Sequence, residues 1–348
     1  MSIHELYMQR CIELARLGIG SVSPNPMVGA VIVCDDQIIG EGYHQFYGQA
    51  HAEVNAINDV LKNQADAASL LKRSILYVNL EPCAHFGKTP PCADLIIRHQ
   101  IPHIVIGCRD SFDQVNGKGT EKLRDAGILV TEGVLEKECL TLNKRFFTRV
   151  SKQRPYIILK WAKTADNYFA KSDKTPQWIT SYASKQLVHR WRSEEDAVLI
   201  GKNTALYDNP QLNVREWAGK NPIRIVIDRN LELPPHLHLF DQSQKTIVFN
   251  SKKTEVNGNI QYLQLEDFDL LLTQLIAFQL YLMDQQSVII EGGAQILNFF
   301  IKAGLWDEAR IFTAPVIWKK GLKAPQLNAS QKETTVIDTD TLEVWYNE

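Results

Sequence analysis

The stretch between His51 and Cys92 constrains this chain more than any other part of it. It begins with His51-Ala52-Glu53, and near its end Cys83 and Cys92 each follow a proline. One imidazole and two thiols are enough to hold a zinc ion through three protein ligands, which leaves the fourth tetrahedral position open for water. The chain is therefore expected to fold so that these three side chains meet at one point.

An open position on zinc has a specific chemical use. Bound zinc lowers the pKa of a water molecule to about 7, so hydroxide becomes available near neutral pH. Glu53 lies two residues after His51, where a carboxylate can carry protons without binding the metal. A His-x-Glu motif followed by Pro-Cys…Cys is typical of zinc-dependent nucleobase deaminases. Two alternatives without catalytic activity remain: a closed structural zinc site, and a pair of buried thiols that bind no metal.

The spacing of the two cysteines departs from the common form of that signature, which has two residues between them. Here eight residues, 84–91, separate Cys83 from Cys92, and they include His85, Lys88 and Thr89. These side chains suit an anionic substrate better than they suit zinc. The insert therefore predicts that the substrate carries a negative charge.

Composition narrows the class of protein. The chain has 348 residues, enough for two domains, and its 45% hydrophobic and 22% charged residues are typical of a globular protein. A net charge of −2 provides no attraction to nucleic acid or to an anionic membrane. All six cysteines fall within the first 139 residues, and no apolar run reaches the ~20 residues that span a bilayer. Without a recognisable secretion leader, we expect a cytoplasmic protein with reduced thiols.

The first half alternates between strand and helix patterns. A mostly parallel sheet with helices on both faces is the expected result. Asn25 lies between two prolines in a loop over 23–29, where it either forms the turn or hydrogen-bonds a base or sugar at the zinc site. The expected helices cover 3–17, 51–61, 93–99, 119–126 and 136–152, and the expected strands cover 28–34, 37–41, 74–80, 103–107 and 129–132.

The polar segment 151–155 predicts a domain boundary, after which the alternation begins again. A loop is expected over 203–215, and the chain is expected to become less regular after residue 313. The predicted strands cover 156–163, 197–201, 223–228, 246–249, 287–290 and 309–313. Three helices are also predicted: one that ends near residue 192, one over 267–282 and one that begins at about residue 294.

Three features of the second half could carry chemistry. Gly292-Gly293 follows an apolar strand, where glycines let the backbone approach a pyrophosphate, although such a pair is more often only a turn. Arg192 and Arg215 have the fork geometry that suits phosphate, although exposed arginines are mostly solvated. Lys160 interrupts an apolar strand, so it faces either solvent or a cleft.

Taken together, these motifs resemble the bifunctional riboflavin-biosynthesis deaminase/reductase family over nearly the whole length. The first half matches its deaminase domain in Asn25-Pro26-x-Val28-Gly29, Gly42-x-His44, His51-Ala52-Glu53 and the segment from Pro82 to Cys92. The second half matches its reductase domain in Trp178-Ile179-Thr180, Asp196-Ala197-x-Leu199-x-Gly201, Thr204…Asp208-x-Pro210-x-Leu212-x-x-Arg215 and Glu291-Gly292-Gly293.

The resemblance implies an α/β protein with two domains. Residues 1–147 would form a cytidine-deaminase-like α/β/α pyrimidine deaminase, and residues 154–348 a dihydrofolate-reductase-like α/β reductase that uses NADPH. A diaminopyrimidinone ribosylamino 5′-phosphate would first lose its ring amine as ammonia, and its ribosyl group would then be reduced to a ribityl chain. The implied cofactors are Zn²⁺ and NADPH. The implied partners are this small substrate and further copies of the chain, with neither nucleic acid nor membrane.

The resemblance also assigns roles to individual residues. Glu53 would be catalytic, and His51, Cys83 and Cys92 would bind zinc. The deaminase substrate would contact Asn25, His44, His85 and Lys88. The reductase cofactor would contact Ala162, Trp178, Thr204, Asp208, Gly292 and Gly293, and the reductase substrate would contact Lys160, Arg192, Leu212, Arg215 and Glu291.

The second half departs from the family at three positions. The family usually has Ser and Gly where this chain has Thr164 and Asn167, and Pro176 stands where relatives often have a polar substrate contact. An alternative is therefore an active deaminase whose second domain no longer catalyses reduction. A nucleic-acid base deaminase is a further alternative, but it predicts a basic surface stripe that the net charge of −2 does not favour.

Overall fold

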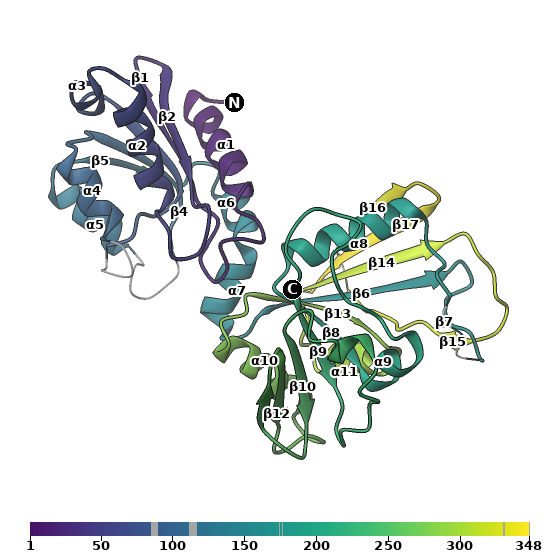
Figure 1. Ribbon diagram of the computed structural model, residues 1–348. Coiled ribbons are helices and arrows are strands. Elements are labelled where there is room, and N and C mark those ends of the chain that lie inside the picture. The colour runs from purple at the N-terminus through teal and green to yellow at the C-terminus, as the bar shows by residue number, and fades with distance from the viewer. Residues whose placement is uncertain (85–89, 111–116, 174, 176, 330, 348) are drawn as a thin grey trace. The chain divides into compact units, whose positions relative to one another are not determined.

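A computed structural model describes the chain except at residues 85–89, 111–116, 174, 176, 330 and 348 (Figure 1). It divides into two compact units, Met1–Gln153 and Arg154–Glu348. Among the described residues no helix is long and apolar enough to cross a bilayer.

The first unit is built on a five-stranded sheet in the order β2-β1-β3-β4-β5. Its strands are β1 (Gly29–Cys34), β2 (Gln37–Tyr43), β3 (Ile75–Leu80), β4 (His103–Cys108) and β5 (Leu129–Glu132). Its helices are α1 (Ile3–Arg16), α2 (Ala52–Asn63), α3 (Ala67–Leu71), α4 (Cys92–Arg98), α5 (Lys118–Asp125), α6 (Glu136–Leu142) and α7 (Lys144–Lys152).

The sheet of the first unit is less parallel than expected. Strands β3, β4 and β5 are parallel, but β1 pairs antiparallel with both β2 and β3. The predicted hairpin explains the first of these pairs, because Asp35 and Asp36 both take positive φ and close a tight turn between the two strands. The expectation of a mostly parallel sheet is therefore wrong for this edge.

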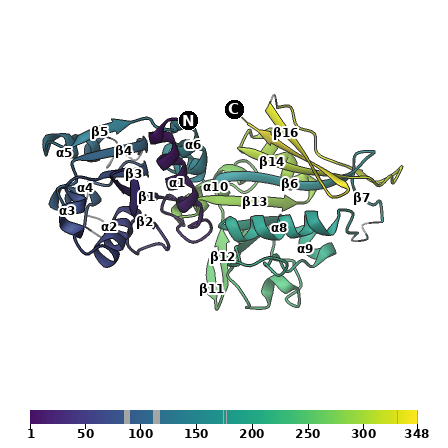
Figure 2. The ribbon, with the colours of Figure 1, turned by 90° about the horizontal axis from the view of Figure 1, so that it is seen from above.

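Alternate residues of each central strand pack against opposite helical layers. On one face Ala30 and Ile32 join the core formed with α2, α3, α4 and α5. On the other face Val31 and Val33 join the core formed with α1 and α6 (Figure 2). Both faces of the sheet are thus covered, which confirms the expected α/β/α layering.

The second unit is built on a ten-stranded sheet in the order β11-β12-β10-β9-β8-β13-β6-β14-β17-β16. The seven strands from β12 to β14 in that order are parallel, and the outermost pairs are antiparallel. Its strands are β6 (Tyr156–Thr164), β8 (Ala197–Gly201), β9 (Ile223–Ile227), β10 (Thr246–Asn250), β11 (Glu255–Asn257), β12 (Ile260–Gln264), β13 (Ser287–Gly292), β14 (Glu308–Ala314), β16 (Gln331–Ile337) and β17 (Asp340–Tyr346).

Helices cover both faces of this second sheet. One face packs against α10 (Leu272–Leu282) and α11 (Ala294–Lys302), and the other against α8 (Tyr182–Glu194) and α9 (Lys202–Asp208). A short ribbon of β7 (Tyr168–Ala170) and β15 (Leu322–Lys323) and the single 3₁₀ turn η1 (His238–Phe240) complete the described elements.

Three expectations about local structure are wrong. The predicted loop over 203–215 begins with α9, which lacks an apolar stripe but buries Ala205 against the sheet. The predicted irregular end instead forms the β16–β17 hairpin beside β14 (Figure 1). The single helix expected over 136–152 is divided at Asn143, where α6 ends and α7 begins.

Candidate functional site

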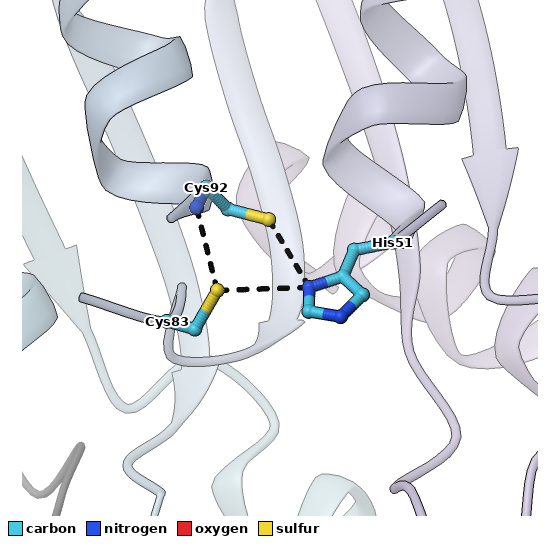
Figure 3. Close-up of side chains that lie close together, drawn as sticks. All are labelled: His51, Cys83 and Cys92. Atoms are coloured by element: carbon cyan, nitrogen blue, oxygen red, sulfur yellow. Dashed lines mark hydrogen bonds between the residues drawn. The ribbon is translucent and has the colours of Figure 1, made fainter. Parts of the chain in front are cut away.

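Three side chains from separate elements of the first unit converge as the sequence predicts (Figure 3). His51 is the N-cap of α2, Cys83 follows β3, and Cys92 is the first residue of α4. The His51 Nδ1 atom lies 3.6 Å from Cys83 Sγ and 3.3 Å from Cys92 Sγ. Among the described residues, this is the one group of histidine, cysteine and acidic side chains whose geometry could hold a metal ion.

These distances fit a tetrahedral zinc ion. With zinc bonds of about 2.1 Å to nitrogen and 2.3 Å to sulfur, adjacent ligand atoms are separated by about 3.6 Å. The backbone N–H of Cys92 donates to Cys83 Sγ at 3.3 Å, and hydrogen bonds from Cys92 lower the pKa of the Cys83 thiol to about 4. A thiolate is the form that binds metal.

Glu53 lies in the first turn of α2, directly after the His51 cap. Its side chain is buried, and burial raises its pKa above the ordinary value. A carboxylate can act as a general base and, once protonated, as a general acid. Glu53 is therefore placed for proton transfer beside the three ligands.

Asn25 and His44 form a hydrogen-bonded pair next to His51. The ring of His44 is buried and lies 5.5 Å from the ring of His51, edge to face. The Ala50 carbonyl can only accept, so His44 Nδ1 donates to it at 3.0 Å. The Nε2 atom of His44 then accepts from Asn25 Nδ2 at 3.0 Å. The structure thus brings both predicted substrate residues to the zinc site, whereas His85 and Lys88 fall outside the described residues.

Sequence reasoning missed two buried asparagines that fix the loop bearing Asn25. Asn79 Oδ1 accepts from the Gly29 N–H at 2.8 Å, and Asn79 Nδ2 donates to the Met27 carbonyl at 3.1 Å. Asn143 bonds the same Met27 from the break between α6 and α7. The one sequence signal for this arrangement is Asn79, a polar residue within an otherwise apolar strand.

Glu81 is a further residue that sequence reasoning did not single out. It lies two residues before Cys83, and its buried carboxylate accepts backbone N–H groups from Asp110 at 3.3 Å, Gly117 at 3.0 Å and Thr120 at 3.1 Å. These bonds tie the end of β3 to the start of α5. Glu81 therefore holds the segment that delivers Cys83.

The second unit contains a cleft of about 1870 Å³. It follows the edge where the parallel strands end, which is where open α/β sheets place their ligands. Of the residues expected to bind cofactor or reductase substrate, only Gly292 does not line it. The residues that do are Lys160, Ala162, Trp178, Arg192, Thr204, Asp208, Leu212, Arg215, Glu291 and Gly293.

A buried ion pair crosses this cleft. Arg192 Nε and Nη2 donate to the two carboxylate oxygens of Glu291 at 2.7 and 2.8 Å, and Lys160 Nζ lies 3.8 Å from Glu291 Oε2. Burial works to raise the pKa of Glu291, but the charges of Arg192 and Lys160 outweigh it and hold that pKa at about 2. Burial lowers the pKa of Lys160. Lys160 thus faces the cleft and not solvent.

Arg215 lies on the loop that runs beside this ion pair. Its Nη1 donates to Asn213 Oδ1 at 2.9 Å, while the Asn213 carbonyl accepts from Arg192 Nη1 at 3.3 Å. His189, one helical turn before Arg192, was not predicted but also lines the cleft. Burial and the two arginine charges lower the pKa of His189 to about 4, so its ring is neutral near pH 7.

The Gly292-Gly293 pair lies against α9. A Cβ atom added at Gly292 or Gly293 would lie 3.3 or 3.2 Å from Thr204 Oγ1, which is shorter than an ordinary van der Waals contact. Thr204 and Asp208 are one helical turn apart on α9, and burial raises the pKa of Asp208. Gly293 is partly exposed and lines the cleft, whereas Gly292 is buried against Thr204, so the backbone of Gly293 is the part of the pair that a ligand can reach.

Two departures from the family pattern are accommodated. Asn167 takes φ +65, the left-handed conformation for which glycine is usual. Thr164 Oγ1 accepts from the Tyr168 N–H at 2.9 Å and donates to Asp166 at 2.6 Å. The turn after β6 therefore forms with the residues present, and Pro176 lies outside the described part of the chain.

Comparisons with known proteins match both units of the chain. Residues 155–340 match the family model of the RibD C-terminal domain, and residues 1–108 match that of the cytidine and deoxycytidylate deaminase zinc-binding region. The riboflavin biosynthesis protein RibD of Aquifex aeolicus is 39% identical, over 96% of this chain and 93% of that protein. The chain belongs to the RibD family.

Other members of the RibD family support the same conclusion. RibD of Bacillus amyloliquefaciens is 37% identical over 98% of this chain and 92% of its own. A solved Thermotoga maritima diaminohydroxyphosphoribosylaminopyrimidine deaminase/5-amino-6-(5-phosphoribosylamino)uracil reductase superposes with a TM-score of 0.89 at 37% identity, covering 99% of both chains. RibD of Acinetobacter baumannii gives a TM-score of 0.87 at 32% identity, also over 99% of both.

Proposed function

We propose that the chain catalyses two successive reactions of riboflavin biosynthesis. The first is the zinc-dependent hydrolytic deamination of 2,5-diamino-6-(ribosylamino)-4(3H)-pyrimidinone 5′-phosphate. The second is the NADPH-dependent reduction of the ribosyl group of the product to a ribityl chain. The observation that carries the proposal is the convergence of His51, Cys83 and Cys92 beside the buried carboxyl of Glu53.

In the deamination, the residues of the first unit hold the reactants and move protons. Zinc, when bound by His51, Cys83 and Cys92, supplies hydroxide near neutral pH. Glu53 takes a proton from the attacking water and returns it to the departing amine, which leaves as ammonia. We assign this reaction to residues 1–147.

The substrate of the deamination would lie against the Asn25–His44 pair. Asn25 Nδ2 lies 3.0 Å from His44 Nε2, and the His44 ring is 5.5 Å from that of His51, so the Asn25 amide lies close to where a base or sugar would approach zinc. The positive charge of Lys88 suits the 5′-phosphate, and His85 completes the set by family resemblance. Replacing Lys88 with glutamine should raise KM more than it lowers kcat.

In the reduction, the cleft of the second unit would hold cofactor and substrate together. NADPH, when bound, supplies the hydride for C1′ of the opened ribose. Glu291 occupies two donors of Arg192, so Arg215 is the arginine we expect to hold the 5′-phosphate. We assign the reaction to residues 154–348, with cofactor contacts from Ala162, Trp178, Thr204, Asp208, Gly292 and Gly293 and substrate contacts from Lys160, Arg192, Leu212, Arg215 and Glu291.

The alternative of a second domain without reductase activity has less support. The turn after β6 keeps its conformation at Asn167 and its hydroxyl at Thr164. We also propose that the chain acts in the cytoplasm as a homo-oligomer, which analytical ultracentrifugation of the purified protein would test.

A coupled assay tests the two reactions separately. Zinc-loaded protein is given the diaminopyrimidinone phosphate, and ammonia release and NADPH consumption are followed independently. We expect both, with reduction lagging behind deamination. Ammonia without NADPH consumption would support the alternative of an inactive second domain, and the absence of both would refute the substrate.

A single substitution tests the role of Glu53. Glu53→Gln should keep stoichiometric zinc but lose ammonia release by about 100-fold or more, as expected for a general acid–base residue. Glu13→Gln is a control, because the Glu13 side chain is 49% exposed on α1. Full activity of Glu53→Gln would remove this residue from the mechanism.

A further inference from the structure

Three neighbouring strands of the second unit end at the same level of the cleft. Gly201 of β8 pairs in register with Ile227 of β9, and Gly292 of β13 pairs with Ile200 of β8. Lys202 follows β8 and Arg229 follows β9 by two residues, and both line the cleft. With strands about 4.8 Å apart, the end of β9 lies about 10 Å from the Gly292-Gly293 pair.

Arg229 and Lys202 are both engaged by acidic side chains that are themselves exposed. Arg229 Nη1 and Nη2 donate to the two oxygens of Asp269 at 2.6 and 2.5 Å, with side chains 50% and 65% exposed. Lys202 forms an ion pair with Glu232, also at the surface. Exposed pairs of this kind contribute little stability, so their partners can be exchanged at small cost.

We propose that Arg229, with Lys202, binds the 2′-phosphate of NADPH and thereby selects this cofactor over NADH. This inference rests on the proposed reductase function. A phosphate monoester carries close to two negative charges at pH 7, and the planar fork of arginine binds it through two charge-assisted hydrogen bonds. The pyrophosphate would lie at Gly292-Gly293, and the adenosine ribose would then extend along the strand ends toward β9.

Asp269 is the residue that Arg229 would release. Without a 2′-phosphate, the carboxylate of Asp269 holds the guanidinium in a bidentate pair. A bound phosphate also offers two acceptor oxygens, with greater negative charge, and would replace the Asp269 carboxylate. Asp269 would then repel the phosphate at close range, so its neutral amide analogue should bind NADPH more tightly.

Equilibrium binding tests the proposal without relying on turnover. NADPH and NADH are titrated into the full-length, zinc-loaded protein, and the dissociation constants are obtained from nucleotide fluorescence. Arg229→Ala should raise the dissociation constant for NADPH on the order of 10-fold to 100-fold, the range for a hydrogen-bonded charged group. The dissociation constant for NADH should stay within about twofold of the wild-type value. Asp269→Asn should tighten NADPH and leave NADH unchanged, a result that a misfolded variant would not give.

Arg190 provides a matched control. Its side chain is 51% exposed, pairs with Glu194 at 2.7 Å and lies 5.8 Å from the ring of Trp217, just as Arg229 lies 5.8 Å from Phe268. Arg190 does not line the cleft. Arg190→Ala should therefore leave the preference for NADPH intact.

Adenosine 2′,5′-bisphosphate and adenosine 5′-phosphate distinguish the phosphate that is bound. Arg229→Ala should weaken the binding of adenosine 2′,5′-bisphosphate only. Equal weakening of the binding of both nucleotides would show that Arg229 contacts the 5′ side, and it would overturn the proposal. The proposal would also be overturned if the wild-type protein binds NADPH and the Arg229→Ala variant keeps the same preference for NADPH over NADH. The reductase function would stand in that case. Failure of wild-type protein to bind either nicotinamide cofactor would reject both.

Discussion

Asn143 binds both backbone polar groups of Met27, 116 residues earlier in the chain. Its Oδ1 accepts from the Met27 N–H at 2.8 Å, and its Nδ2 donates to the Met27 carbonyl at 2.9 Å. Because Asn143 lies at the break between α6 and α7, this contact ties the end of the first unit to the loop that carries Asn25. The position of Asn25, which we propose to contact substrate, thus depends on an asparagine far from it in sequence.

Substitution of Asn143 should reveal this dependence. Asn143→Ala leaves the buried Met27 N–H without its acceptor, which should lower the free energy of unfolding by about 1–3 kcal/mol. It should also raise KM for ammonia release while bound zinc stays stoichiometric. Asn63→Ala is the matched control, because Asn63 also hydrogen-bonds through its amide, to Asp59 at 2.7 Å, but is exposed. Loss of zinc in Asn143→Ala would show instead that the metal site itself had been disturbed.

Removal of a metal ligand should separate the two reactions. Cys83→Ser should lose bound zinc and ammonia release, since a serine hydroxyl is a poor ligand for zinc. NADPH consumption with the deaminated intermediate supplied directly should continue, because the cleft lies in the second unit. Cys34→Ala, at a buried cysteine of β1, should keep its zinc. Metal analysis and the two separate assays provide the comparison.

The depressed pKa of Glu291 predicts how stability should change with pH. Its pKa falls from 4.5 to about 2 on folding, so its ionised form stabilises the fold above pH 4.5, and this contribution is lost as pH falls toward 2. The difference in unfolding free energy between wild type and Glu291→Gln should therefore shrink from about 3 kcal/mol near pH 7 to roughly 1 kcal/mol at pH 3.

Urea unfolding at several pH values would measure that difference. Glu255→Gln is the control, because Glu255 pairs with Lys253 at the surface and should contribute little at any pH. A difference between wild type and Glu291→Gln that stayed constant with pH would argue against an ionised Glu291 held by Arg192 and Lys160.

The turn at Asn167 offers a test of backbone strain. Asn167→Ala should cost about 1–2 kcal/mol, because alanine disfavours positive φ, whereas Asn167→Gly should be nearly neutral. Thermal unfolding of the two variants beside wild type would show the contrast. Equal destabilisation by both would point to the Lys163–Asn167 hydrogen bond, 2.9 Å long, as the important contact.

The elements that could be read from the sequence share one property. The segment 197–201, for example, is a strand with the predicted bounds, because a continuous run of buried apolar side chains marks it. The β16–β17 hairpin and α9 could not be read in this way. Residues 332–336 of β16 are exposed, and α9 is held mainly through Ala205, so β16 and α9 lack the apolar pattern of an independent element.

The chemistry available to the first unit of this protein can be read from its amino-acid sequence. His51, Glu53, Cys83 and Cys92 are recognisable because zinc chemistry demands particular side chains at short spacings. The distant residues that support them become apparent only in the folded protein. Asn143 reaches Met27, Glu81 gathers three backbone N–H groups, and Glu291 meets Arg192 and Lys160, through contacts that depend on how strands and helices pack. Such contacts join residues far apart in the chain, so no local pattern records them.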